Sequence, residues 1–139
     1  MNAETTEHTF IRAALWFFLC LSLVEAMQSI KKSSDFKEVY RKRDLRADPF
    51  LVMYKFGNHS GESRIGISVS KRVGNSVVRH RLKRRIREIA RLHSDRICAG
   101  FDLVVVLRPF SAKKVVSYWD LEASFLRLLK RHHLIIEKE

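Results

Sequence analysis

The sequence contains little of the residues that build several protein classes. Of its 139 residues only two are cysteine, five are glycine and two are proline. Two cysteines cannot make a disulfide-rich scaffold or a four-cysteine zinc site. So little glycine and proline excludes collagen-like and low-complexity proteins. The main apolar run, residues 13–24, is twelve residues long and too short to span a bilayer as a helix. The remaining composition, 46% hydrophobic, suits one globular domain.

Acidic residues are also scarce. Lys and Arg number 27 against 15 Asp and Glu, which gives a net charge of +12. The excess is uneven, because residues 1–26 carry a net charge of −2 whereas residues 71–96 hold ten Lys and Arg against two acids. Such a basic segment predicts an anionic partner, either a nucleic acid or an anionic membrane surface.

The first 26 residues differ in character from the rest. Three interpretations are open: an extension upstream of a true start at Met27, a native helix that packs poorly, and a signal peptide cleaved near Val24-Glu25-Ala26. The acidic stretch before the apolar run argues against a signal peptide, and we favour the extension. We therefore divide the chain into an extension (1–26), a basic globular domain (27–134) and a short tail (135–139).

From residue 27 the pattern alternates between helices and strands. Asp35 and Glu38 have the spacing of a capping box at the start of a short helix that ends at a basic Arg41-Lys42-Arg43 run. Residues 50–56 and 64–70 are predicted strands, joined as a hairpin through a loop at 57–61. Alternate positions predict their inward faces: Phe50, Val52, Tyr54 and Phe56, then Ile65, Ile67 and Val69.

A long helix is predicted to begin near Ser76, where Gly74 and Asn75 offer caps. Its predicted core stripe is Val78, Leu82, Ile86, Ile89 and His93. Residues 101–107 are nearly all apolar, which is typical of an interior strand. A last helix runs from Tyr118 to about His132, with Tyr118, Leu121, Phe125, Leu128 and Leu129 on its apolar face. This order indicates a two-layer α/β sandwich of the α+β class.

The helix that begins at Ser76 carries the strongest functional signal. Beside its apolar stripe lie Arg79, His80, Lys83, Arg84, Arg87 and Arg91, with Lys71 and Arg72 just upstream. Like charges four residues apart repel, and cations in the first turn oppose the helix macrodipole. A bound polyanion reverses the sign of both effects, and an arginine fork suits phosphate. The alternative is a merely solvated basic face, over which the composition favours a nucleic acid.

Residues 70–88 resemble a known signature. Ser70-Lys71-Arg72 ends a strand, Val73-Gly74-Asn75-Ser76-Val77 follows, and Arg79-His80-Arg81 opens the basic helix. This order resembles that of bacterial ribonuclease P protein subunits, in which the position of His80 is usually Asn. Residues 35–40, 51–54 and 101–109 are similar to the family's first helix, a sheet strand and the last strand. The resemblance covers roughly residues 27–134 and leaves out 1–26.

The resemblance implies both a fold and a function. The fold would be like the second domain of ribosomal protein S5, with the order αβββαβα and a left-handed βαβ connection, an exception to the usual hand. The protein would be cytoplasmic, without a membrane partner. It would bind a catalytic RNA and assist endonucleolytic removal of the 5′ leader from precursor tRNA. The phosphodiester chemistry and the magnesium ions would belong mainly to the RNA.

The resemblance also implies two sets of site residues. The implied RNA-binding residues are Lys71, Arg72, Arg79, His80, Arg81, Lys83, Arg84 and Arg87. The implied leader cleft lies between the first helix and the sheet, lined by Phe36, Tyr40 and Tyr54. Aromatic rings stack on bases of any identity, which suits a leader of variable sequence. Without the resemblance, helix-spaced aromatics such as Phe36 and Tyr40 are more often core residues.

Other candidate sites are weaker. His132, His133 and Glu137 could suggest a metal site, but adjacent side chains diverge on a helix. Cys98 is interpreted as a small apolar group rather than a nucleophile. Asp35, Asp102 and Asp120 occur singly, and no carboxylate cluster indicates a two-metal nuclease. We therefore assign no catalytic residue and no metal ligand to this chain.

Three function classes remain open at this point. The first is the protein subunit of an RNA enzyme, which the residue 70–88 signature favours. The second is a non-enzymatic RNA-binding protein such as a ribosomal protein, which composition alone does not separate from the first. The third is a cationic membrane-surface protein, which would need apolar residues that a globular core already claims.

Overall fold

The computed structural model describes residues 27–109 and 116–136, so our expectations for residues 1–26 and Glu137 lie outside the described residues. In chain order the elements are β1 (Gln28–Ser29), α2 (Ser33–Lys42), β2 (Leu45–Ala47), β3 (Leu51–Gly57), β4 (Arg64–Val69), α3 (Ser76–Leu92), the 3-10 turn η1 (Ser94–Arg96), β5 (Phe101–Leu107) and α5 (Tyr118–Arg131). After β1, which the sequence pattern did not reveal, the helices and strands follow the expected order αβββαβα.

The sheet has the strand order β1-β4-β5-β3-β2, with β5 at its centre. β5 pairs in parallel with β4 and antiparallel with β3. The predicted interior position of residues 101–107 is therefore confirmed. The predicted hairpin between residues 50–56 and 64–70 is wrong, because β5 lies between β3 and β4. The handedness of the β4–α3–β5 connection stays a prediction.

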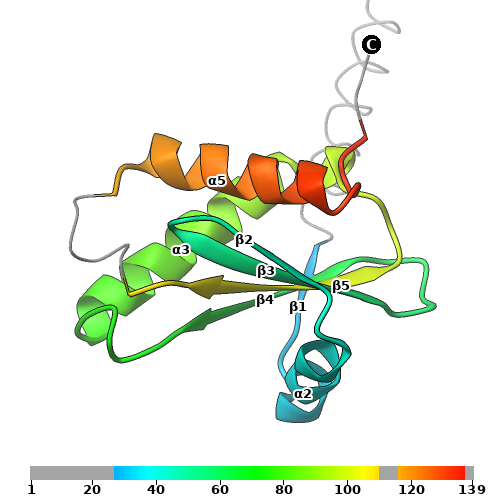
Figure 1. The fold of residues 1–139 in the computed structure, drawn as a ribbon, viewed down its shortest axis with the longest axis horizontal. Coiled ribbons are helices and arrows are strands. Elements are labelled where there is room, and N and C mark those ends of the chain that lie inside the picture. Colours follow the sequence, from blue (N-terminus) through cyan, green and yellow to red (C-terminus); the bar gives the residue numbers. More distant parts are fainter. Residues whose placement is uncertain (1–26, 110–115, 137–139) are drawn as a thin grey trace, which may run out of the picture.

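Helices lie on both faces of this sheet (Figure 1). α3 and α5 lie together on one face, where the main core forms the expected two-layer sandwich. Among the described helices, α2 is the one on the opposite face, over a smaller cluster of buried Ile30, Val39 and Val104. The sheet therefore separates the surface of α3 from the surface of α2.

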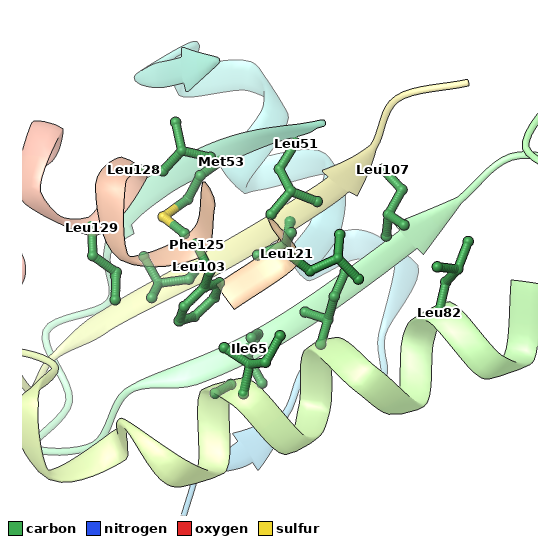
Figure 2. Close-up of a cluster of buried hydrophobic side chains, with 14 of the residues drawn as sticks. Leu51, Met53, Ile65, Leu82, Leu103, Leu107, Leu121, Phe125, Leu128 and Leu129 are labelled. Atoms are coloured by element: carbon green, nitrogen blue, oxygen red, sulfur yellow. The ribbon is translucent and has the colours of Figure 1, made fainter. Parts of the chain in front are cut away.

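The main core fills the space between the sheet and the helices α3 and α5 (Figure 2). Leu51 and Met53 of β3 are fully buried there, whereas Tyr54 and Phe56 face α2. The prediction that Tyr54 and Phe56 share a face is confirmed, but Phe50, predicted on the same face, packs on the main core instead. The alternate positions Leu51 and Met53 are buried as well. Ile65, Ile67 and Val69 of β4 pack on the main core as predicted.

The two long helices follow their predicted apolar stripes closely. In α3, Leu82, Ile86 and Ile89 are buried, and Val78 is half-buried. His93 departs from the prediction because it is the C-cap, half-buried, with Nε2 3.8 Å from a Glu122 oxygen. In α5, buried Leu121, Phe125, Leu128 and Leu129 confirm the predicted face, and Ser117 and Asp120 form a capping box.

The capping box predicted for the first helix is wrong. α2 begins at Ser33, its N-cap is Lys32, and no side chain caps it. Asp35 instead lies within the first turn and faces Arg64, as described below. At the other end of the chain, Ile135 forms an antiparallel bridge with Ile97, so the described structure continues into the segment that we had assigned to a tail.

Candidate nucleic-acid interface

α3 begins where its sequence supplies a cap. Asn75 precedes the helix, and its side-chain oxygen accepts a hydrogen bond from the Val78 N–H at 3.0 Å. A β-carbon at Gly74 would lie 3.0 Å from the Val78 side chain, so this turn packs closely. The Gly-Asn pair therefore sets the start of the helix directly after the turn that holds Lys71 and Arg72.

The basic residues around α3 form a surface that we call the α3 cationic face. Because one side of α3 is buried, the other side is turned toward solvent. Its predicted RNA-binding residues are exposed at Lys71, Arg72, His80, Arg81, Arg84 and Arg87 and half-buried at Arg79 and Lys83. Within residues 27–109 and 116–136, no acidic side chain forms an ion pair with any of them.

The arginines of α3 differ in their surroundings. Arg84, Arg87, Glu88 and Arg91 line a hollow along the helix. The Nε of Arg79 is buried and has no hydrogen-bond partner among the described residues, although the residue as a whole is only half-buried. Arg85 differs because its guanidinium donates to the Val116 carbonyl at 3.4 Å and thereby joins α3 to the start of α5.

The three predicted leader-cleft aromatics meet on the opposite side of the sheet, and we call them the aromatic face. The Phe36 and Tyr40 rings of α2 lie 6.4 Å apart, and the Tyr40 and Tyr54 rings lie 4.9 Å apart at 87°. All three residues are half-buried and pack on the cluster around Val39 and Val104. They therefore belong to a small core and still present part of their surface to a ligand.

Gly66 of β4 makes room for the aromatic face. A β-carbon on Gly66 would lie 2.7 Å from the ring of Phe36, closer than real atoms approach. The Phe36 ring therefore lies directly over the backbone of β4. The sequence alone did not reveal this role, because a glycine within a strand indicates a close approach to the backbone without showing which group approaches.

An ion-pair network holds the first turn of α2 against the sheet. Asp102, buried in the middle of the sheet, accepts hydrogen bonds from Arg64 Nε at 2.9 Å and Asn58 Nδ2 at 2.8 Å. The same guanidinium reaches Asp35 of α2 at 3.4 Å. The Asp102 carboxylate raises the pKa of Arg64 above its ordinary value. In the sequence Asp102 stands apart from the other acids, and the available signal for its role is that it is the one polar residue of the apolar segment 101–107.

The histidines near the C-terminus do not form a common site. His132 is buried, and its Nε2 lies 2.8 Å from the Met53 carbonyl oxygen. His133 is exposed. Cys98 is half-buried against the main core. In the described part of the chain, no three His, Cys, Asp or Glu side chains come together as a metal ion requires.

The fold and these two surfaces define a small α+β protein of the RNA-binding class. A cationic helix faces one way and a set of partly exposed aromatic rings faces the other, the two features that single-stranded and structured RNA require. No helix within the described ranges is both long and apolar enough to cross a membrane.

Comparisons with known proteins give the family. The sequence profile of the family described as Ribonuclease P matches residues 24–133. The "Ribonuclease P protein component" of Lachnoclostridium phytofermentans is 42% identical over 112 residues, which cover 81% of this chain and 95% of that protein. The component of Clostridium novyi is 45% identical over 106 residues, 75% of this chain and 92% of that protein. The chain therefore belongs to the ribonuclease P protein family.

Solved structures agree with this assignment. The RNase P protein from Staphylococcus aureus superposes with a TM-score of 0.70 at 33% identity, over 76% of this chain and 95% of that one. The RNase P protein from Thermotoga maritima also gives 0.70 at 30% identity, over 80% and 99%. The α+β fold expected from the sequence is thus the fold of this family.

Proposed function

We propose that this chain is the protein subunit of ribonuclease P and that its two surfaces bind different RNAs. The α3 cationic face binds the catalytic RNA subunit. The aromatic face binds the 5′ leader of precursor tRNA, whose removal by endonucleolytic cleavage gives the mature 5′ end. The protein acts in the cytoplasm and needs no membrane partner.

The observation that carries this proposal is the separation of the two surfaces by the sheet. α3 and α2 lie on opposite faces (Figure 1), so an RNA bound along α3 leaves the aromatic face open to a second RNA. Unpaired cations suit the phosphates of a large folded RNA. Half-buried rings suit the bases of a single strand. A ribosomal-type RNA-binding protein would explain the first surface, but the family membership favours the ribonuclease P role.

The chemistry of cleavage is assigned to the RNA subunit. Its magnesium ions would supply charge stabilisation for phosphodiester hydrolysis. The buried Asp102 carboxylate is already engaged by Arg64, and the described acids form no cluster that fits the ion. The proposal therefore gives this chain the tasks of binding and orienting RNA and derives no step from its own carboxylates.

The test compares precursor tRNA cleavage by the full chain alone, the cognate RNA alone, and the two together at low magnesium. We expect no cleavage by the protein, slow cleavage by the RNA and a clear acceleration by the mixture. Cleavage by protein purified free of RNA would contradict the assignment of the chemistry. A failure of the mixture to exceed the RNA alone would contradict the subunit role itself.

A further inference from the structure

The end of α2 contains an arginine in an unfavourable backbone conformation. Arg43 is the C-cap of the helix, with φ 51° and ψ 26°, and its N–H donates to the Tyr40 carbonyl at 3.2 Å. This left-handed conformation is the usual place for glycine, because a β-carbon is strained there. An arginine in a backbone conformation that it disfavours suggests a functional role for its side chain.

The Arg43 side chain forms no bond that would stabilise the described part of the fold. Arg43 is exposed, and within residues 27–109 and 116–136 its guanidinium has no hydrogen bond or ion pair. Its neighbours differ, because Arg41 pairs with Glu38 at 3.5 Å and Arg46 donates to the Leu45 carbonyl at 3.0 Å. All three cations of this run suit the negative end of the helix dipole, but Arg43 alone among them takes the left-handed conformation.

The position of Arg43 places it beside the aromatic face. The residue directly follows the helix that carries Tyr40, and the chain then enters β2, where Leu45 lies opposite Tyr54. The Asp44 carbonyl accepts the Lys55 N–H at 2.9 Å, which fixes this turn against β3. Arg41, Lys42 and Arg43, which we call the α2 rim, therefore border the end of the aromatic face formed by Tyr40 and Tyr54.

The charge of this region suits a phosphate backbone. Residues 31–46 include seven Lys and Arg against three Asp and Glu. Of these acids, Asp35 faces Arg64, Glu38 faces Arg41, and Asp44 lies near Arg46 and Lys55. When the bases of a single strand stack on aromatic rings, its phosphates run along the margin of the ring platform. The α2 rim is the cationic part of that margin.

We propose that the α2 rim, and Arg43 above all, binds the phosphates of the single-stranded 5′ leader whose bases lie on the aromatic face. The inference rests on the proposed function and adds a backbone contact on the opposite face of the sheet from α3. The occupant is the leader rather than the catalytic RNA, because the rim borders the rings of Tyr40 and Tyr54 and not α3.

The test uses the assembled complex and measures affinity for precursor tRNA and for mature tRNA at several salt concentrations. Arg43→Gly relaxes the backbone, so we expect an unfolding temperature equal to or above that of the parent chain. The precursor affinity should fall roughly fivefold at 0.1 M salt, and the salt slope should decrease by about 0.7, the value for one phosphate contact on a single strand. Affinity for mature tRNA should stay unchanged.

Two variants and one altered ligand sharpen the test. Arg43→Lys keeps the charge and should retain most of the affinity, whereas Lys130→Ala removes an exposed cation from α5 and should change neither affinity. A leader with uncharged methylphosphonate linkages should bind the parent and Arg43→Gly complexes equally. Equal losses for precursor and mature tRNA, or no loss at all, would overturn the rim proposal.

The outcome for the parent complex separates this proposal from the proposed function. If the parent complex binds precursor no better than mature tRNA, leader recognition itself is wrong. If the parent complex discriminates and Arg43→Gly discriminates equally well, only the rim assignment is wrong.

Discussion

His132 is a buried titratable side chain in a region of mixed charge. Its Nε2 donates to the Met53 carbonyl, while its Nδ1 is buried, has no hydrogen-bond partner among the described residues and lies 3.9 Å from an Asp44 oxygen. Burial lowers the pKa of His132 below its ordinary value of 6.5. The Asp44 carboxylate opposes this shift, whereas Lys55 and Arg46 add to it.

This histidine predicts a loss of stability in mild acid. In the unfolded chain it takes up its proton near pH 6.5, before the folded chain does. Its contribution to the free energy of unfolding is therefore complete above that pH and decreases below it, down to the folded-state pKa. Urea unfolding at pH 7.5 and 5.5 should show this decrease for the parent chain and for His133→Gln, which alters an exposed neighbour. It should be smaller in His132→Gln, and an equal decrease in all three would contradict the prediction.

Gly66 provides a second prediction at the scale of one residue. Gly66→Ala would place a β-carbon 2.7 Å from the Phe36 ring and so displace that ring from β4. We expect the variant to lose about 1–3 kcal/mol in precursor binding, the contribution of one stacked ring. Binding to the catalytic RNA should be unchanged.

A matched control exists for this glycine. Gly61 has open space where a β-carbon would lie, so Gly61→Ala should leave both affinities unchanged. The measurement is a pair of equilibrium affinities for assembled complexes at one salt concentration. If Gly66→Ala stays folded and binds precursor normally, Phe36 takes no part in leader recognition.

At the scale of elements, we expect the cations of α3 to lower the stability of the isolated protein and to strengthen its binding to the catalytic RNA. Arg87 lies four residues from both Lys83 and Arg91, and Arg87→Gln relieves this repulsion with little change in helix propensity. The isolated protein should become more stable by a few tenths of a kcal/mol. The salt slope for binding the catalytic RNA should decrease by about one. Lys130→Gln on α5 is the control, and a slope equal to that of the parent would exclude Arg87 from the RNA contact.

The helices also show which local features were predictable. The apolar stripes of α3 and α5 follow from residues within a few positions of one another. The start of α2 was not predictable in this way, because Asp35 faces Arg64 rather than its own helix end. A contact between residues 29 positions apart leaves no local pattern in the sequence.

At the scale of the whole molecule, strand order was the main feature that the sequence did not reveal. Residues 50–56 and 64–70 have the spacing of a hairpin, but β5 provides a long apolar strand that pairs with both. The same limit applies to the site. The residues of the α3 cationic face lie close together in the sequence, so this surface was predictable. The network of Arg64 and Asp102 and the α2 rim depend instead on how α2 docks on the sheet.

The boundary of the folded unit gives the last prediction. The family match begins at residue 24, and Met27 already packs against the main core. A chain that starts at Met27 should therefore unfold at the same temperature as the full chain and give the same acceleration with the catalytic RNA. Differential scanning fluorimetry and precursor cleavage check both points. A marked loss of stability would show that residues 1–26 contribute to the domain.

The central place of β5 has a consequence for how the protein is made. A ribosome delivers β3, β4 and α3 before residues 101–107 exist, so the nascent chain carries two strands that both lack their shared neighbour. The sheet can assemble only after β5 has emerged from the ribosome, and the main core can form only after α5 has emerged as well. Contacts of such long sequence separation form slowly. The complete core can therefore form only near the end of synthesis, and until then the basic α3 segment is exposed to cellular polyanions while part of its apolar side is uncovered.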